Sequence, residues 1–175
     1  MSESFQDAIA RAVQTVYALD AVTPMDIMVI EGGARIHLKR EDASKIHSYK
    51  WRGAFNKMSA LKESGWSGPC VATSAGNHAQ GVAASARQLD MQATIFMPTS
   101  TPQLKQKSVI QHGGSNVQIK LVGDTFDESQ VSAEKFAEKV SATILPPFDD
   151  PLVICLLYTS PSPRDQRGSR MPSSA

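Results

Sequence analysis

The sequence predicts an α/β domain in which helices cover a parallel sheet. From residue 51 onward, stretches with the apolar spacing of helices alternate with short apolar stretches of strand length. This alternation is typical of parallel sheets, because a helix usually forms the crossover between two parallel strands. Thr125 and Glu128 also have the spacing of a capping box, which marks the start of one of these helices.

The first fifty residues follow a different pattern. A helix is expected over residues 5–18, where apolar residues recur on one face. Two short strands, 27–30 and 36–39, then flank the tight turn at Gly32-Gly33. This part of the chain therefore predicts one helix and one hairpin ahead of the alternating region.

The alternating region is expected to contain four helices and four strands. Thr101 and Pro102 are interpreted as the N-cap and first residue of one helix, and Gly113-Gly114 as its end. The expected helices are 51–63, 77–89, 103–111 and 125–139, and the expected strands are 69–73, 91–97, 116–121 and 142–145.

The end of the chain has a different composition. Residues 155–175 are rich in Ser, Pro and Arg and lack apolar periodicity after their first few residues, so we expect them to be disordered. They could form a regulatory tail with Ser-Pro sites at Ser160 and Ser162, but we favour a non-native extension. The composition therefore predicts one globular domain over residues 1–154, followed by the tail 155–175.

Composition and charge exclude several classes of function. The net charge is +1 and 6% of the residues are aromatic, which does not favour nucleic-acid binding. The sequence shows no secretory signal and no apolar stretch of membrane-spanning length, so we expect a cytoplasmic protein with no membrane partner. Cys70 and Cys155 are too few for a disulfide framework or a zinc site, and no metal site is expected.

The first candidate site residue is Lys50. A lysine amine can join a carbonyl cofactor covalently, provided that it is kept partly away from water. Tyr49 and Trp51 flank it and could provide such surroundings. Taken alone, however, the segment is more typical of an exposed lysine at the start of a helix. Arg52 is interpreted as structural, with Asp42 or Glu41 as its partner.

The second candidate is the turn between an expected strand and the helix that follows it. The residues Thr73-Ser74-Ala75-Gly76-Asn77 bring backbone N–H groups and the positive end of a helix dipole to one place. Such a turn can bind an anion. Helix capping by Ser74 and Asn77 is an equally good explanation. His78 is as typical of a packed residue as of a catalytic one.

Other possible sites are weaker. No glycine-rich motif of the dinucleotide-binding or nucleoside-triphosphate-binding kind occurs in the sequence. Asp149 and Asp150 lie beside two prolines, which favours a solvated turn over a metal or acid–base site.

Several segments together resemble one enzyme family. The chain is similar to threonine ammonia-lyases (threonine deaminases or dehydratases) of pyridoxal-phosphate fold type II over roughly residues 20–154. The segments that carry the resemblance are Lys39-Arg40-Glu41-Asp42, His47-Ser48-Tyr49-Lys50-Trp51-Arg52-Gly53-Ala54, Ser74-Ala75-Gly76-Asn77-His78-Ala79-Gln80-Gly81-Val82-Ala83, Met97-Pro98 and Pro146-Pro147-Phe148-Asp149. The resemblance implies that residues 1–154 are a partial pyridoxal-phosphate-dependent catalytic domain.

The resemblance implies a role for each site residue. Lys50 would hold pyridoxal 5'-phosphate covalently, Asn77 would hydrogen-bond to the oxygen on its ring, and Tyr49 would pack near that ring. The turn of Ser74, Ala75, Gly76, Asn77 and His78 would bind the substrate carboxylate.

The residues around Lys50 look closer to the biosynthetic branch of the family, which implies isoleucine biosynthesis. Ala75 also differs from the serine that serine racemases carry there.

The implied reaction is β-elimination on L-threonine, with L-serine as a poorer substrate, giving 2-oxobutanoate and ammonia. The family's glycine-rich phosphate loop does not occur in these 175 residues, so the chain by itself is expected to be inactive. The parent protein is expected to be a homo-oligomer. Two alternatives stay open: a β-replacement enzyme of the cysteine synthase type, and a non-catalytic α/β module.

Overall fold

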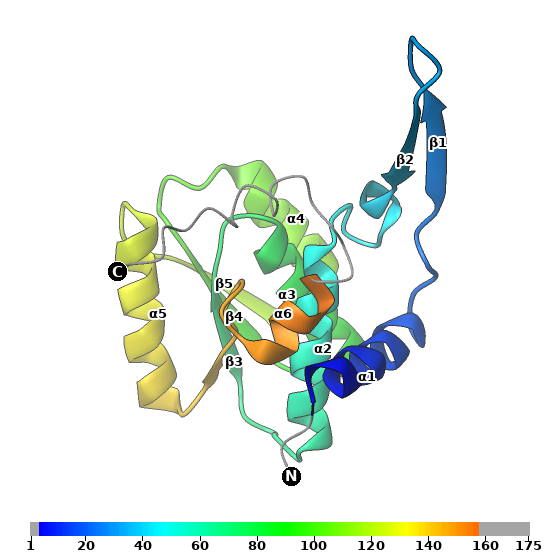
Figure 1. The fold of residues 1–175 in the computed structure, drawn as a ribbon. Helices are drawn as coiled ribbons and strands as arrows, with labels where there is room; N and C mark the ends of the chain where they lie inside the picture. The colour runs from blue at the N-terminus through cyan, green and yellow to red at the C-terminus, as the bar shows by residue number, and fades with distance from the viewer. Residues whose placement is uncertain (1–3, 158–175) are drawn as a thin grey trace, which may run out of the picture.

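The computed structural model describes residues 4–157 and contains the expected parallel sheet (Figure 1). Its four strands lie in the order β5-β4-β3-β6, and all three pairings are parallel. The strands are β3 (Cys70–Thr73), β4 (Ala93–Met97), β5 (Val117–Leu121) and β6 (Thr143–Ile144). The fold class expected from the alternating sequence pattern is confirmed.

Helices cover both faces of this sheet, as Figure 1 shows. Alternate residues of β3 point to opposite faces, as in any strand. Cys70 and Ala72 belong to the core beneath α2 and α3, whereas Val71 packs with Phe96 in the core beneath α5. The four helices that follow the expected pattern are α2 (Lys50–Glu63), α3 (Asn77–Leu89), α4 (Gln103–Gly113) and α5 (Phe126–Val140).

Two further helices, α1 (Phe5–Tyr17) and α6 (Pro151–Leu157), pack beside α2. Ala12 and Val16 of α1 form a second core with Trp51 and Phe55 of α2. The sequence prediction did not include α6. The domain boundary expected at residue 154 falls inside this helix, and the rest of the expected tail, 158–175, lies outside the described residues.

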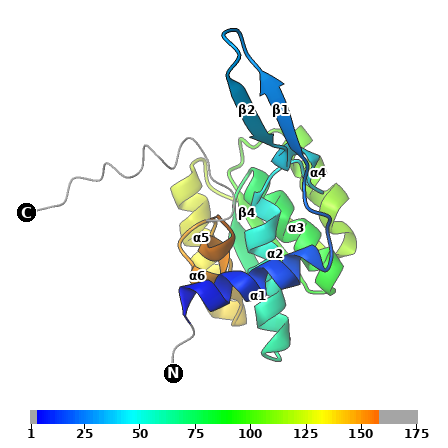
Figure 2. The same ribbon diagram turned by 45° about the vertical axis from the view of Figure 1, so that its right-hand side comes forward.

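The expected hairpin is also present, as β1 (Met25–Val29) and β2 (Arg35–Lys39), an antiparallel pair. Figures 1 and 2 show that it projects away from the helices and the parallel sheet. A short 3₁₀ helix, η1 (Glu41–Ala43), then leads toward α2, and another, η2 (Gly114–Asn116), joins α4 to β5.

The helix ends test three predictions. The capping box of Thr125 and Glu128 is confirmed, and Gly114 ends α4 with a positive φ of 57°. The cap predicted for α4 is wrong. Pro102 has an extended ψ of 139° and takes the N-cap position itself, and the Thr101 side chain does not cap the helix. The helix begins at Gln103, as the expected range 103–111 has it.

No helix among residues 4–157 combines the length and the apolar character that crossing a membrane requires.

Candidate active site

The topology singles out one place on the sheet. The chain adds β4 and β5 on one side of β3 and then returns to place β6 on the other side, so the strand order reverses at β3. In open parallel sheets, ligands bind beyond the carboxyl ends of the strands at such a reversal. The segments that leave β3 and β6 therefore border the expected binding place.

The turn after β3 carries unused hydrogen-bond donors. The Ser74 N–H donates to Phe96 O at 3.1 Å, and the Gly76 N–H donates to Ser74 Oγ at 3.2 Å. Within residues 4–157, the N–H groups of Ala75, Asn77 and His78 donate to no protein acceptor. The Asn77 side chain is exposed. The turn thus presents several donors at the N-terminus of α3, which can hold an anion.

Lys50 lies at the first position of α2 and is partly buried. Its Nζ donates to the backbone oxygen of Pro147 at 2.9 Å and lies 5.6 Å from the centre of the Tyr49 ring. Burial lowers the pKa of the Lys50 amine below its usual value, because the charged form loses water. Lys50 is therefore not the fully exposed lysine that its heptapeptide alone suggests.

His78 is a packed residue. It is only 4% exposed, and its Nε2 lies 2.9 Å from Leu145 O. Burial lowers its pKa to about 4, so the ring is neutral at pH 7. Its Nδ1 is buried and has no hydrogen-bond partner among residues 4–157. His78 can thus join the site through its backbone N–H, while its side chain anchors the segment after β6.

Lys50 and the turn after β3 lie at the same edge of the sheet. Lys50 and His78 both contact the short segment that follows β6, at Pro147 and Leu145. The helices α2 and α3 also approach closely, since a Cβ on Gly81 would stand 2.9 Å from the Trp51 Cα. The structure therefore brings the two candidate motifs together.

Of the two partners expected for Arg52, the structure has Glu41. The Arg52 Nε donates to Glu41 Oε2 at 3.1 Å, and its side chain is only 3% exposed. Asp42, the other candidate, pairs instead with Arg40. This ion pair attaches η1 to the start of α2 and so fixes the backbone near Lys50.

The prediction of a solvated turn holds for Asp149, which is exposed, but is wrong for Asp150. The Asp150 Oδ2 lies 2.9 Å from Lys57 Nζ, and its Oδ1 accepts from the Leu152 N–H at 2.8 Å, which caps α6. A signal for this helix was present in the sequence, since Asp followed by Pro is typical of an N-cap and the first helical position.

The thiol of Cys70 is chemically inert. Burial raises the pKa of the Cys70 thiol to about 11, so it stays protonated, and the Cys155 side chain lies outside the described part of the structure. No cluster of metal-binding side chains occurs among residues 4–157.

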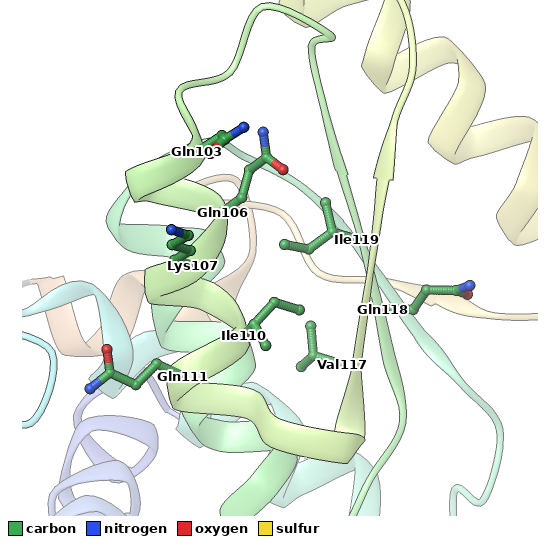
Figure 3. A pocket seen from close by; sticks show the side chains of 8 residues that line it. All are labelled: Gln103, Gln106, Lys107, Ile110, Gln111, Val117, Gln118 and Ile119. Atoms are coloured by element: carbon green, nitrogen blue, oxygen red, sulfur yellow. The ribbon is translucent and has the colours of Figure 1, made fainter.

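A groove of about 780 Å³ lies between α4 and β5, where Val117 and Ile119 point toward the helix (Figure 3). None of the candidate site residues lines this groove.

Comparisons with known proteins find relatives of one family. A family model described as "Pyridoxal-phosphate dependent enzyme" matches residues 21–161. The biosynthetic L-threonine dehydratase of Lactococcus lactis is 48% identical over 121 residues, which cover 69% of this chain and 29% of that protein. The biosynthetic, chloroplastic threonine dehydratase 1 of Solanum lycopersicum is 48% identical over 122 residues, which cover 70% of this chain and 20% of that protein.

A solved structure has the same fold as this chain. The processed form of threonine deaminase isoform 2 from Solanum lycopersicum superposes with a TM-score of 0.76 at 37% identity, over 88% of this chain and 43% of that one. The chain spans less than a third of the two curated relatives described above.

Proposed function

The chain belongs to the family of pyridoxal-phosphate-dependent enzymes of fold type II, and from this premise we propose that it forms part of a biosynthetic threonine ammonia-lyase. The proposed reaction converts L-threonine to 2-oxobutanoate and ammonia, the first step of isoleucine biosynthesis, with L-serine as a poorer substrate. The observation that carries the proposal is the meeting of Lys50 and the Ser74–Asn77 turn at one sheet edge. The dehydratases that match at 48% identity support the choice of substrate.

The residues present fit pyridoxal phosphate. The Lys50 amine is partly withdrawn from water, which favours the neutral form that bonds to an aldehyde. Beside it, the N–H groups of the turn are available to a carboxylate. Gly76 leaves space for a ligand, since nothing within residues 4–157 lies within 4 Å of the place where its Cβ would stand.

Each residue has a proposed task in the reaction. Bound pyridoxal phosphate supplies an electron sink for the charge that develops when the Cα proton leaves. Lys50 would hold the cofactor through its amine, and once the substrate amine has replaced it there, the freed Nζ would be placed to take the Cα proton. The N–H groups at Ala75, Asn77 and His78, with the Ser74 hydroxyl, fix the substrate carboxylate so that the Cα–H bond faces Lys50.

The other predicted site residues are proposed to orient the cofactor. Asn77 is exposed at the start of α3 and can donate its side-chain amide to the ring oxygen of the cofactor. The Tyr49 ring lies beside the Lys50 amine and can pack against the cofactor. Ala75 has no hydroxyl, so no proton acceptor is proposed at that position.

Several finer points extend the proposal. The complete protein is proposed to be a cytoplasmic homo-oligomer. The 175-residue chain is proposed to be inactive by itself and to bind the cofactor weakly, since it spans only part of its relatives. The catalytic part is proposed to reach at least Leu157, where α6 ends, instead of stopping at residue 154.

To test the proposal, the complete reading frame that contains these residues is expressed, and the protein is assayed with pyridoxal phosphate and L-threonine. We expect 2-oxobutanoate to appear, with slower turnover of L-serine. The matched control is Lys50→Arg, which keeps the positive charge but cannot serve as the amine, and turnover should fall by at least about a thousandfold. Full turnover in the Lys50→Arg protein, or turnover of O-acetylserine with sulfide and none of L-threonine, would contradict the proposal.

A further inference from the structure

One face of α2 holds the segment that follows β6. Lys50, Gly53 and Lys57 recur at spacings of three and four residues, which places them on one side of the helix. Lys50 Nζ donates to Pro147 O, and a Cβ on Gly53 would stand 2.9 Å from Val153 Cγ1. Lys57 Nζ lies 2.9 Å from Asp150 Oδ2. Three successive positions along α2 therefore contact residues 147–153.

The segment from residue 145 to residue 150 is held at both ends. At its start, the Leu145 N–H donates to Val71 O at 2.8 Å, and Leu145 O contacts His78 Nε2. At its end, Asp150 joins Lys57 through Oδ2 and caps α6 through Oδ1. Pro147, whose carbonyl accepts from Lys50, lies between these two anchors.

The downstream anchor is better shielded from water than an ordinary surface ion pair. The side chains of Lys57 and Asp150 are 18% and 14% exposed, whereas Arg40 and Asp42 are 43% and 59% exposed. Exposed pairs contribute little to structure because water screens them, and shielded pairs with a second hydrogen bond fix geometry more strongly. Loss of this pair should therefore let the Pro147 carbonyl move.

We propose that Lys57 and Asp150 are a positioning pair that holds the Pro147 carbonyl, and with it the bordering segment, against the Lys50 amine. The inference rests on the proposed function, because it names residues that prepare the same lysine. Neither residue touches the reacting atoms. Both act through the backbone of the segment.

The pKa of the Lys50 amine should depend on how closely the segment lies against it. Desolvation is what lowers the pKa of the Lys50 amine, and a displaced segment would readmit water to it. His78 is the titratable group of α3 whose pKa responds to the charge of Lys50, and it stays neutral above about pH 4. Lys57 and Asp150 form the ion pair between α2 and the segment, and Asp149 is the exposed charged neighbour in the segment. A looser segment should therefore raise the pKa of Lys50.

Two substitutions separate positioning from a direct effect of charge. Asp150→Asn removes a negative charge but keeps an oxygen that can cap α6, whereas Lys57→Met removes a positive charge. A direct charge effect would move the pKa of Lys50 down in the first variant and up in the second. Loss of positioning would move it up in both.

The measurement is competitive acetylation of the 175-residue chain over a range of pH, with each lysine quantified by mass spectrometry. Lys135, exposed on α5, serves as the internal reference. We expect the midpoint of Lys50 labelling to shift to higher pH in both variants and to return toward the original value in Lys57→Arg. Asp149→Asn removes an equal charge from an exposed neighbour and should leave the midpoint unchanged.

A further variant keeps the inference testable if a single substitution unfolds the chain. The double variant Lys57→Met/Asp150→Asn leaves no unpaired charge and does not change the net charge, so an upward shift in it also supports positioning. Unchanged midpoints in the folded variants, or shifts in opposite directions, would overturn the inference. The labelling needs neither cofactor nor L-threonine, so its result is separate from the turnover that tests the proposed function.

Discussion

The sheet edge around Lys50 and the β1–β2 hairpin differ in the contacts that their side chains make. At the sheet edge, Lys50, His78 and Asp150 each have a partner from a distant part of the chain. In the hairpin, apolar side chains face water, from Leu38 at 38% exposed to Val29 at 65%. The sheet edge is thus fixed by tertiary contacts, whereas the hairpin depends on its own pairing.

The contacts of the hairpin lie mainly at its base. The Arg40 guanidinium lies 2.5 Å from Asp26 Oδ2, and the Lys39 amine donates to Thr23 O. An isolated pair of strands is at best marginally stable in water, so the hairpin should contribute little to the stability of the described chain. Substitutions that disturb packed side chains or close backbone contacts near the sheet edge should therefore lower the free energy of unfolding strongly, and substitutions in the hairpin should change it little.

The largest effect should come from His78 as the pH falls. Its pKa is about 4 in the folded chain and about 6.5 in the unfolded one, so the unfolded state binds more protons between these values. The free energy of unfolding should be fully retained above about pH 6.5 and fall as the pH drops toward 4, by at most about 3 kcal/mol. Urea titrations at successive pH values measure this fall.

The control compares two histidine substitutions. His78→Gln removes the buried titrating ring and should reduce the fall in stability. His37→Gln changes an exposed residue of the hairpin and should leave the fall in place. An equal fall in both variants would show that His78 is not its source.

A smaller effect is expected at Gly81, where α2 and α3 meet. A Cβ there would stand 2.9 Å from Trp51 Cα and 3.1 Å from Trp51 N, which are backbone atoms and cannot move aside easily. Gly81→Ala should therefore lower the free energy of unfolding by about 1–2 kcal/mol, even though alanine favours helices. Gly76→Ala, with nothing within 4 Å among the described residues, should change it by less than about 0.5 kcal/mol. A more stable Gly81→Ala chain would contradict the close approach.

The smallest effect is expected in the hairpin. Val29→Thr replaces a methyl group that already faces water, so the free energy of unfolding should change by less than about 0.5 kcal/mol. Val82→Thr makes the same change on a fully buried side chain of α3 and should cost about 1–2 kcal/mol, because the hydroxyl loses water. Similar losses in thermal or urea unfolding of both variants would remove the distinction between the two regions.

Local sequence patterns predicted most of the fold. The alternating helices and strands, the hairpin and the Thr125 capping box depend on residues that are close in sequence. The helix α6 was missed although Asp150-Pro151 carries an N-terminal signal, because the segment is short and two prolines precede it.

The candidate site was predicted only in part. Lys50 and the Ser74–Asn77 turn carry recognisable motifs, and the structure brings them to one edge. The contact of Lys50 with Pro147 spans 97 residues, and that of His78 with Leu145 spans 67. Both use backbone carbonyls, which every residue has, so no side-chain pattern marks them.

The most direct test of the account is to find which amine binds the cofactor. The protein from the complete reading frame is incubated with pyridoxal phosphate, reduced with borohydride, digested, and mapped by mass spectrometry. We expect a pyridoxyl group on Lys50, with Lys45 and Lys57 unmodified. A pyridoxyl group on another lysine while Lys50 stays free would contradict it.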